Sequence, residues 1–214
     1  MPRRQSSPQA DVCRPIFTGE GMLTNPDIAE LTAFRRQLHQ YPELSGQEEA
    51  TAATITAALK ALSPTSVVTG LGGHGVAAIL NSGQAGPTVL FRAELDALPI
   101  VEESGVVWTS CIPGKAHLCG HDGHMTMLLG LARLLCRHPV ECGRIILMFQ
   151  PAEEDGSGAR AGGPVQWWRS WFCEDSPAQC RHGVAPRPAL LSAVSTSSPS
   201  SPKKYLRAVS YTHL

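Results

Sequence analysis

The sequence has no excess of charge of either sign, because 18 Lys and Arg residues are balanced by 18 Asp and Glu residues. Binding along a nucleic-acid backbone requires a basic surplus, so we expect no nucleic-acid partner. Apolar runs of the ~18 residues that cross a bilayer are also lacking, which predicts no membrane span. The basic start Met-Pro-Arg-Arg is not followed by the apolar segment of a signal peptide.

The cysteine pattern argues against a small disulfide-linked protein. Seven cysteines is an odd number, and their spacing is not that of a small disulfide-linked scaffold. We therefore expect reduced thiols and a cytoplasmic location. Hydrophobic residues make up 43% of the chain, which is enough for a sizeable core.

The character of the chain changes along its length. Residues 1–24 are polar and Pro-rich and are expected to form a loose N-terminal arm. Residues 25–161 alternate between helical and strand patterns. Residues 162–214 collect Trp, Cys, Ser and Pro without periodicity, so we interpret them as out-of-frame translation or a disordered tail. A genuine divergent C-terminus is the alternative.

Three segments of the central part have apolar residues at helical spacing. One helix follows Pro26, a second opens at a capping box over Ser45–Glu48, and a third covers Met125–Cys136. The residues expected to face inward are Ile28, Leu31, Phe34 and Leu38; Ala52, Ile55, Leu59 and Leu62; and Met127, Leu128, Leu131, Leu134 and Leu135.

Strand patterns lie between these helices. They cover Ser66–Thr69, Val76–Leu80, Thr88–Arg92 and the apolar run Arg144–Phe149. Helices alternating with apolar strands predict an α/β fold, with a central sheet that has helices on its faces. Ligands in such folds bind where strands end and loops begin, and three polar clusters fall at such places.

The densest cluster is Cys119-Gly-His121-Asp122-Gly-His124. Thiol, imidazole and carboxylate groups this close together suit Zn²⁺ or Mn²⁺, and the glycines allow the backbone to fold around an ion. The alternative is a polar loop that caps the following helix, with Asp122 as N-cap. The density of ligand types favours metal binding.

The other two clusters follow strands. Glu153 and Glu154 come after the apolar strand, where one carboxylate could ligate a metal while its neighbour takes a proton from water. A solvated acidic turn is the alternative. Asp96 follows the strand Thr88–Arg92 and is a candidate to hydrogen-bond a ligating His, or else an ordinary cap or turn carboxylate.

Four segments follow one another along the chain: the opening Arg35–Ser45, then Arg-Ala-Glu-Leu-Asp-Ala-Leu-Pro-Ile, Cys-Gly-His-Asp-Gly-His and Phe-Gln-Pro-Ala-Glu-Glu. In this order they resemble the zinc-peptidase-like amidohydrolases, which include hippurate hydrolase, N-acyl-amino-acid amidohydrolases and auxin-conjugate hydrolases. The resemblance covers about residues 27–161. It implies the N-terminal part of a zinc-peptidase-like catalytic domain, with the lid or dimerisation domain missing.

The resemblance also implies roles. Cys119 would bridge two divalent ions, Zn²⁺ or Mn²⁺, with His121 and Glu154 as further metal ligands. Glu153 would be the general base, and Asp96 matches the family's acidic residue near the metals. The implied reaction is hydrolysis of the amide bond of a small N-acyl amino acid, and a homo-oligomeric parent protein is compatible with it.

The resemblance stops after Ser157–Ala161. The family continues there with a helix and an Ala-Leu-His segment that supplies another ligand, whereas this chain runs into Gly162–Trp168. The metal site is therefore expected to be incomplete and the chain itself inactive. The alternatives are a dipeptidase or other metallo-exopeptidase, and a non-catalytic metal-binding half-domain.

Overall fold

The computed structural model describes residues 22–158 and 207–210. Most of the predicted arm and tail therefore lie outside the described residues. Five strands form one sheet: β1 (Ser66–Leu71), β2 (Gly75–Asn81), β3 (Thr88–Glu94), β4 (Arg144–Gln150) and β5 (Arg207–Ser210). The spatial order is β1-β2-β4-β3-β5. The α/β class predicted from the sequence is confirmed.

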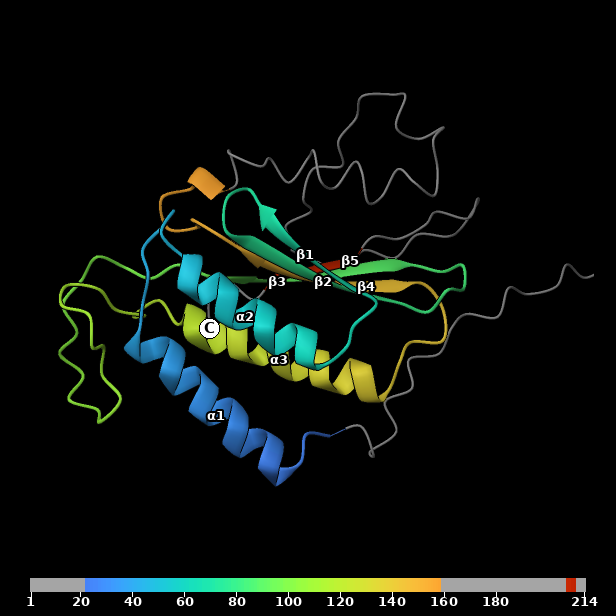
Figure 1. Cartoon of the computed structure of the whole chain (residues 1–214), viewed down its shortest axis with the longest axis horizontal. Coiled ribbons are helices and arrows are strands. Elements are labelled where there is room, and N and C mark those ends of the chain that lie inside the picture. Colours follow the sequence, from blue (N-terminus) through green and yellow to red (C-terminus); the bar gives the residue numbers. More distant parts are fainter. Residues whose placement is uncertain (1–21, 159–206, 211–214) are drawn as a thin grey trace, which may run out of the picture.

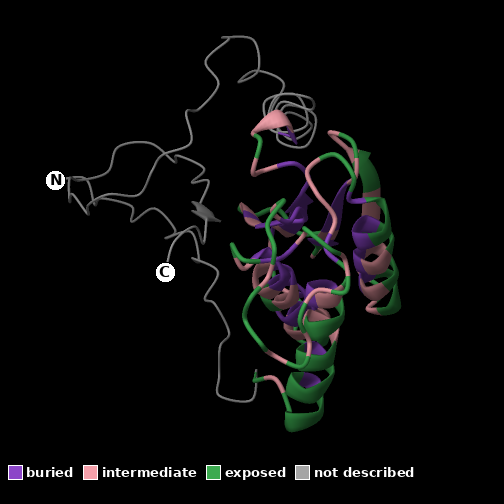
Figure 2. Ribbon diagram, turned by 90° about the vertical axis from the view of Figure 1, so that its left-hand side faces the viewer, coloured by how far each residue is buried: buried purple, intermediate pink, exposed green. Residues whose placement is uncertain are grey.

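Three helices accompany the sheet: α1 (Asn25–Gln40), α2 (Glu49–Ala61) and α3 (His121–Arg137). In the described ranges all three lie on the same side of the sheet (Figure 1), rather than on both faces as the sequence pattern suggested. The helices α2 and α3 contact the strands, and α1 packs against α3. Buried residues are concentrated between helices and sheet (Figure 2).

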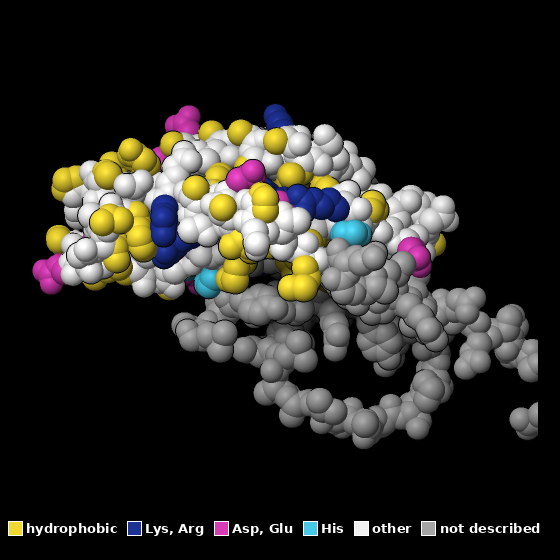
Figure 3. All heavy atoms as spheres, turned by 90° about the horizontal axis from the view of Figure 1, so that it is seen from below, with side chains coloured by type: hydrophobic (Ala, Val, Ile, Leu, Met, Phe, Trp, Pro, Cys, Tyr) yellow, Lys and Arg dark blue, Asp and Glu magenta, His cyan; other side chains and the backbone are white. Residues whose placement is uncertain are grey.

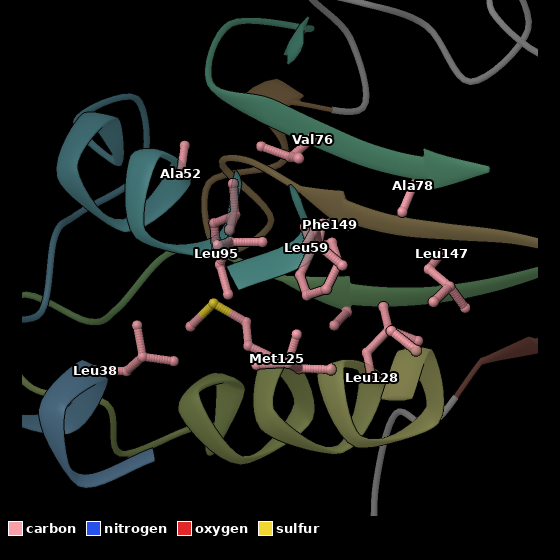
Figure 4. Close-up of a cluster of buried hydrophobic side chains, with 14 of the residues drawn as sticks. Leu38, Ala52, Leu59, Val76, Ala78, Leu95, Met125, Leu128, Leu147 and Phe149 are labelled. Atoms are coloured by element: carbon pink, nitrogen blue, oxygen red, sulfur yellow. The ribbon is translucent and has the colours of Figure 1, made fainter. Parts of the chain in front are cut away.

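The main core lies in this interlayer space. Figure 4 shows Phe149 and Leu147 of β4 facing Met125 and Leu128 of α3. A smaller buried cluster, Ala77, Leu90, Ile146 and Met148, lies on the opposite face of the sheet. Because successive strand residues alternate between faces, β4 contributes to both clusters.

Two residues expected to face inward are exposed. Ile28 is 50% exposed, because α1 buries only a narrow stripe through Leu31 and Leu38 against α3. Met127 is 59% exposed, because it lies two residues after the buried Met125 and thus on the far side of α3. On the face seen in Figure 3, acidic and basic side chains are interspersed rather than gathered into a single patch.

Two helix starts also differ from the sequence prediction. The proposed capping box over Ser45–Glu48 is wrong, because Glu48 is the N-cap of α2 but its side chain makes no capping bond, and the Ser45 hydroxyl donates to Asp96. The Glu43 carboxylate accepts the N–H groups of Ala50 and Thr51 instead. The capping box in the described ranges lies at Thr24 and Asp27, where it opens α1. Asp27 also binds Arg137 through both carboxylate oxygens, which ties the start of α1 to the end of α3.

The helix α3 begins at His121 rather than at Met125. Its N-cap is Gly120, which has a left-handed φ of 95°, so Asp122 is not the cap. His121, Asp122 and His124 of the candidate metal-binding cluster therefore lie in the first turn of α3, and Cys119 directly precedes its N-cap. None of the described helices is both long and apolar enough to cross a bilayer.

Candidate metal centre

The topology of the sheet brings the three polar clusters together. β3 and β4 are parallel neighbours, and Glu94 pairs with Gln150 where both strands end. The helix α3 connects them, so its first turn begins at this same edge. Asp96, His121 and the acidic pair at 153–154 thus converge from three separate segments, which their spacing in the sequence could not establish.

The three metal ligands implied by the resemblance lie together. One ligand atom from each of Cys119, His121 and Glu154 lies within 4.8 Å of the other two. The Glu153 carboxylate is next to them, with its Oε2 3.8 Å from His121 Nε2. Glu154 Oε1 lies at the same distance, 3.8 Å, from His121 Nε2. Thiolate, imidazole and carboxylate in this arrangement fit a borderline-soft divalent ion.

His121 is held in one orientation. Its Nδ1 donates to the backbone carbonyl of Asp96 at 2.8 Å and lies 3.6 Å from the Asp96 carboxylate. The ring is 3% exposed. Because Nδ1 is occupied, Nε2 is directed to the acidic pair and is the nitrogen available for a metal.

The buried Asp96 carboxylate is held by hydrogen bonds from neighbouring segments of the chain. Its Oδ2 accepts the Ser45 hydroxyl at 2.7 Å and the Glu154 N–H at 2.9 Å. Burial alone would raise the pKa of this carboxyl, but the hydrogen bonds from His121, Glu154 and Ser45 lower it to about 2. Asp96 therefore stays ionised and orients both His121 and the backbone of Glu154.

The site is strongly negative. Burial, together with the carboxylates of Glu154 and Glu153, raises the pKa of the Cys119 thiol to about 11. Burial would lower the pKa of His121, but the side-chain and backbone bonds to Asp96 and the charge of Glu94 raise it to about 9. The negative field that favours protons on these two groups also favours a divalent cation, which would have to displace both protons to bind.

Glu94 and His124 form a second group with His121. The sequence pattern placed His124 in the candidate metal-binding cluster but gave Glu94 no role. Glu94 is 2% exposed, and its two oxygens are already engaged by Arg92 Nη2 at 2.9 Å and His124 Nδ1 at 3.0 Å. Glu94 thus orients His124, and with His121 these two residues form a second group able to hold a metal ion. The available signal was that Glu94 is the last residue of the strand that precedes Asp96.

A buried histidine outside the motif supports the site from α1. His39 Nδ1 contacts Asp122 Oδ2 at 2.8 Å, and its Nε2 contacts Glu102 Oε1 at 3.0 Å. Arg35 Nε lies 2.7 Å from the same Asp122 oxygen. Asp122 therefore links the first turn of α3 to α1. Sequence reasoning missed His39, because its two partners lie 83 and 63 residues away along the chain.

Glu102 connects α1 to the loop that leads to Cys119. Burial alone would raise the pKa of Glu102, but hydrogen bonds from His39, Ser104 and the Ser110 N–H lower it to about 2. The carboxyl of an unfolded chain titrates near 4.5. Ionised Glu102 therefore stabilises the fold above about pH 4.5, and this stabilisation is lost as the pH falls toward about 2.

Substituting Glu102 by glutamine is expected to lower the free energy of unfolding at pH 7 by about 1.5–3 kcal/mol, the usual range for a hydrogen bond to a charged group. The difference between variant and parent should shrink as the pH falls from about 4.5 to about 2. Urea unfolding at several pH values measures both effects. Glu103→Gln, at the exposed neighbouring position, is the control and should change stability by less than about 0.5 kcal/mol.

Comparisons with known proteins find relatives of one family. Residues 90–180 match the profile of Peptidase family M20/M25/M40. N-acetyl-L-cysteine deacetylase of Bacillus subtilis is 44% identical over 135 residues, covering 61% of this chain and 31% of that protein. IAA-amino acid hydrolase ILR1-like 5 of Arabidopsis thaliana is 44% identical over 136 residues, covering 61% of this chain and 30% of its own length.

Solved structures show the same relationship. A dinuclear metal-binding M20 peptidase of Bacillus subtilis superposes with a TM-score of 0.64 at 34% identity, covering 68% of this chain and 41% of that one. The aminobenzoyl-glutamate utilization protein of Klebsiella pneumoniae has a TM-score of 0.52 at 27% identity, over 65% of this chain and 40% of that one.

The fold is that of part of an α/β catalytic domain. Over this part the chain is similar to the M20 family of peptidases and amidohydrolases. It spans about a third of the length of the curated relatives named above.

Proposed function

We propose that the chain carries part of the active site for metal-dependent hydrolysis of the amide bond in small N-acyl amino acids. The observation that carries this proposal is the convergence of Cys119, His121 and Glu154 beside the carboxylate of Glu153. The names of the two relatives, a deacetylase of N-acetyl-L-cysteine and a hydrolase of IAA-amino acids, support a substrate in which an amino acid is conjugated.

The donor set fits a divalent metal, Zn²⁺ or Mn²⁺. Cys119, His121 through Nε2 and Glu154 would hold the ions. When bound, the ions polarise the scissile carbonyl and lower the pKa of the attacking water. Glu153 would accept a proton from that water on a carboxylate oxygen and return it to the amine that leaves. Asp96 would keep His121 in the required tautomer.

The three ligands implied by the resemblance are fewer than two ions require. We therefore propose that the 214-residue chain alone shows no more than trace hydrolysis. We also propose a cytoplasmic location, no nucleic-acid or membrane partner, and a parent enzyme that forms homo-oligomers.

Metal binding by the chain is the first test. The purified chain is expected to bind Zn²⁺ or Mn²⁺, and Cys119→Ala should weaken binding by more than about a hundredfold, since losing even an outer partner of a ligand costs about 10–100-fold. Equilibrium dialysis followed by metal analysis measures this. Cys111→Ala, at an exposed free cysteine, is the matched control. An unchanged number of metal ions bound per chain in Cys119→Ala would show that Cys119 is not a ligand.

A metallo-exopeptidase is the second candidate, because the superposed Bacillus subtilis structure is described as a peptidase. The same residues would then act on a dipeptide bond. Parallel assays with N-acyl amino acids and dipeptides separate the two candidates. Metal binding without turnover of either substrate would instead favour a non-catalytic metal-binding half-domain.

A further inference from the structure

Glu48 lies at the start of α2 yet serves the segment that follows β4. Its carboxylate makes no capping bond to α2. Instead Oε1 accepts the backbone N–H of Ala152 at 2.7 Å, across 104 residues of sequence. Glu48 is 0% exposed, and its Oε2 has no hydrogen-bond partner among the described residues.

Burying a carboxyl group with one oxygen unpaired costs free energy. An apolar side chain at this place would avoid that cost. Since the side chain does not cap the helix, its one bond, to Ala152, is the contact that distinguishes it from an apolar residue. The position of that bond is therefore informative about what Glu48 does.

Ala152 is held in an unusual conformation. Its φ is 50°, in the left-handed region that residues with a Cβ rarely adopt. The surroundings constrain it further: the Gly158 N–H donates to the Ala152 carbonyl at 3.0 Å, and a Cβ added to Gly158 would collide with the Pro151 carbonyl. A strained residue of this kind persists only where several contacts fix it.

The strained residue directly precedes Glu153 and Glu154. The Ala152 N–H is bound by Glu48, and the Glu154 N–H is bound by Asp96. These two carboxylates therefore anchor the backbone on either side of Glu153. The turn at Ala152 sets the direction in which the chain leaves β4, and hence where both acidic side chains point.

We propose that Glu48 is a positioning residue that fixes the turn at Ala152 and thereby aims Glu154 at the metal and Glu153 at the reacting water. This proposal rests on the proposed function for the roles of those two carboxylates. Glu48 acts by the reach of its side chain and not by its charge, because it contacts a neutral backbone N–H.

Reach and charge can be separated with two substitutions. Glu48→Gln keeps the length and an oxygen acceptor but removes the charge. Glu48→Asp keeps the charge but shortens the side chain by one methylene, so that it falls short of the Ala152 N–H. The matched control is Glu43→Asp, the same shortening at a carboxylate that binds the first turn of α2 without contacting the turn at Ala152.

The measurement is titration of the full chain with Co²⁺, followed by the thiolate-to-cobalt charge-transfer band of Cys119 and the visible bands that report carboxylate ligation. Glu48→Asp is expected to bind Co²⁺ about 10–100-fold more weakly, the range for loss of an outer-shell partner, with altered visible bands. Glu48→Gln should keep the spectrum of the unchanged chain. Glu43→Asp should lower the melting temperature and leave the spectrum unaltered.

A second readout needs no metal. Hydrogen exchange of the Ala152 amide, followed by NMR, should be faster in Glu48→Asp and nearly unchanged in Glu48→Gln. If Glu48→Gln loses Co²⁺ binding while Glu48→Asp keeps it, charge is the operative property and the proposal is overturned. Equal spectra and exchange rates in both variants would overturn it as well. Failure of the unchanged chain to bind Co²⁺ would instead refute the metal site of the proposed function.

Discussion

Glu153→Gln is expected to slow amide hydrolysis by about 10²–10⁴-fold, the range for loss of one general base, and to leave the metal content unchanged. The two adjacent carboxylates differ in their surroundings. Glu154 belongs to the ligand group with Cys119 and His121, and its N–H is fixed by Asp96. The Glu153 side chain is 32% exposed, against 21% for Glu154, and so has more access to water and substrate.

This measurement needs a host that supplies the rest of a catalytic domain. Residues 25–158 can replace the matching segment of N-acetyl-L-cysteine deacetylase of Bacillus subtilis, which is 44% identical over 135 residues. Turnover of N-acetyl-L-cysteine and metal content are then compared for the two variants. Glu154→Gln should lose metal and activity together, while Glu153→Gln loses activity alone. Full turnover in Glu153→Gln, or normal metal content in Glu154→Gln, would show that the two roles are misassigned.

Phe149→Ala is expected to lower the free energy of unfolding by about 3–5 kcal/mol, as large-to-small changes of a buried aromatic residue do. Phe149 is 0% exposed and lies near the end of β4, in the space between sheet and helices (Figure 4). Gln150 and the acidic pair follow directly, so the cavity would also loosen the strand end that presents them.

Urea unfolding of the full chain measures this change. Met127→Ala is the informative control, because the sequence pattern placed Met127 in the core, whereas the structure exposes it on α3. A surface substitution of this kind should change stability by less than about 0.5 kcal/mol. A large loss in Met127→Ala, or a small one in Phe149→Ala, would contradict the way in which α3 faces the sheet.

The local features of the chain could be read from the sequence. The four predicted strands and three predicted helices exist, because apolar periodicity reflects which face of an element is buried. Their ends were less well predicted. The start of α3 at His121 depends on a left-handed Gly120, and the start of α2 depends on the distant Glu43 carboxylate rather than on a capping box.

The sequence by itself determined the α/β class and the order of its elements, as well as the motifs at 96, 119–124 and 153–154, since these depend on residue type and short spacing. The tertiary structure decided which of those motifs meet. Glu94 pairs with Gln150 only because β3 and β4 are parallel neighbours in one particular register. The contacts of His39 with Glu102 and of Glu48 with Ala152 join residues 63 and 104 positions apart. Such contacts are set by packing and strand pairing along the whole fold, so a local sequence pattern cannot predict them.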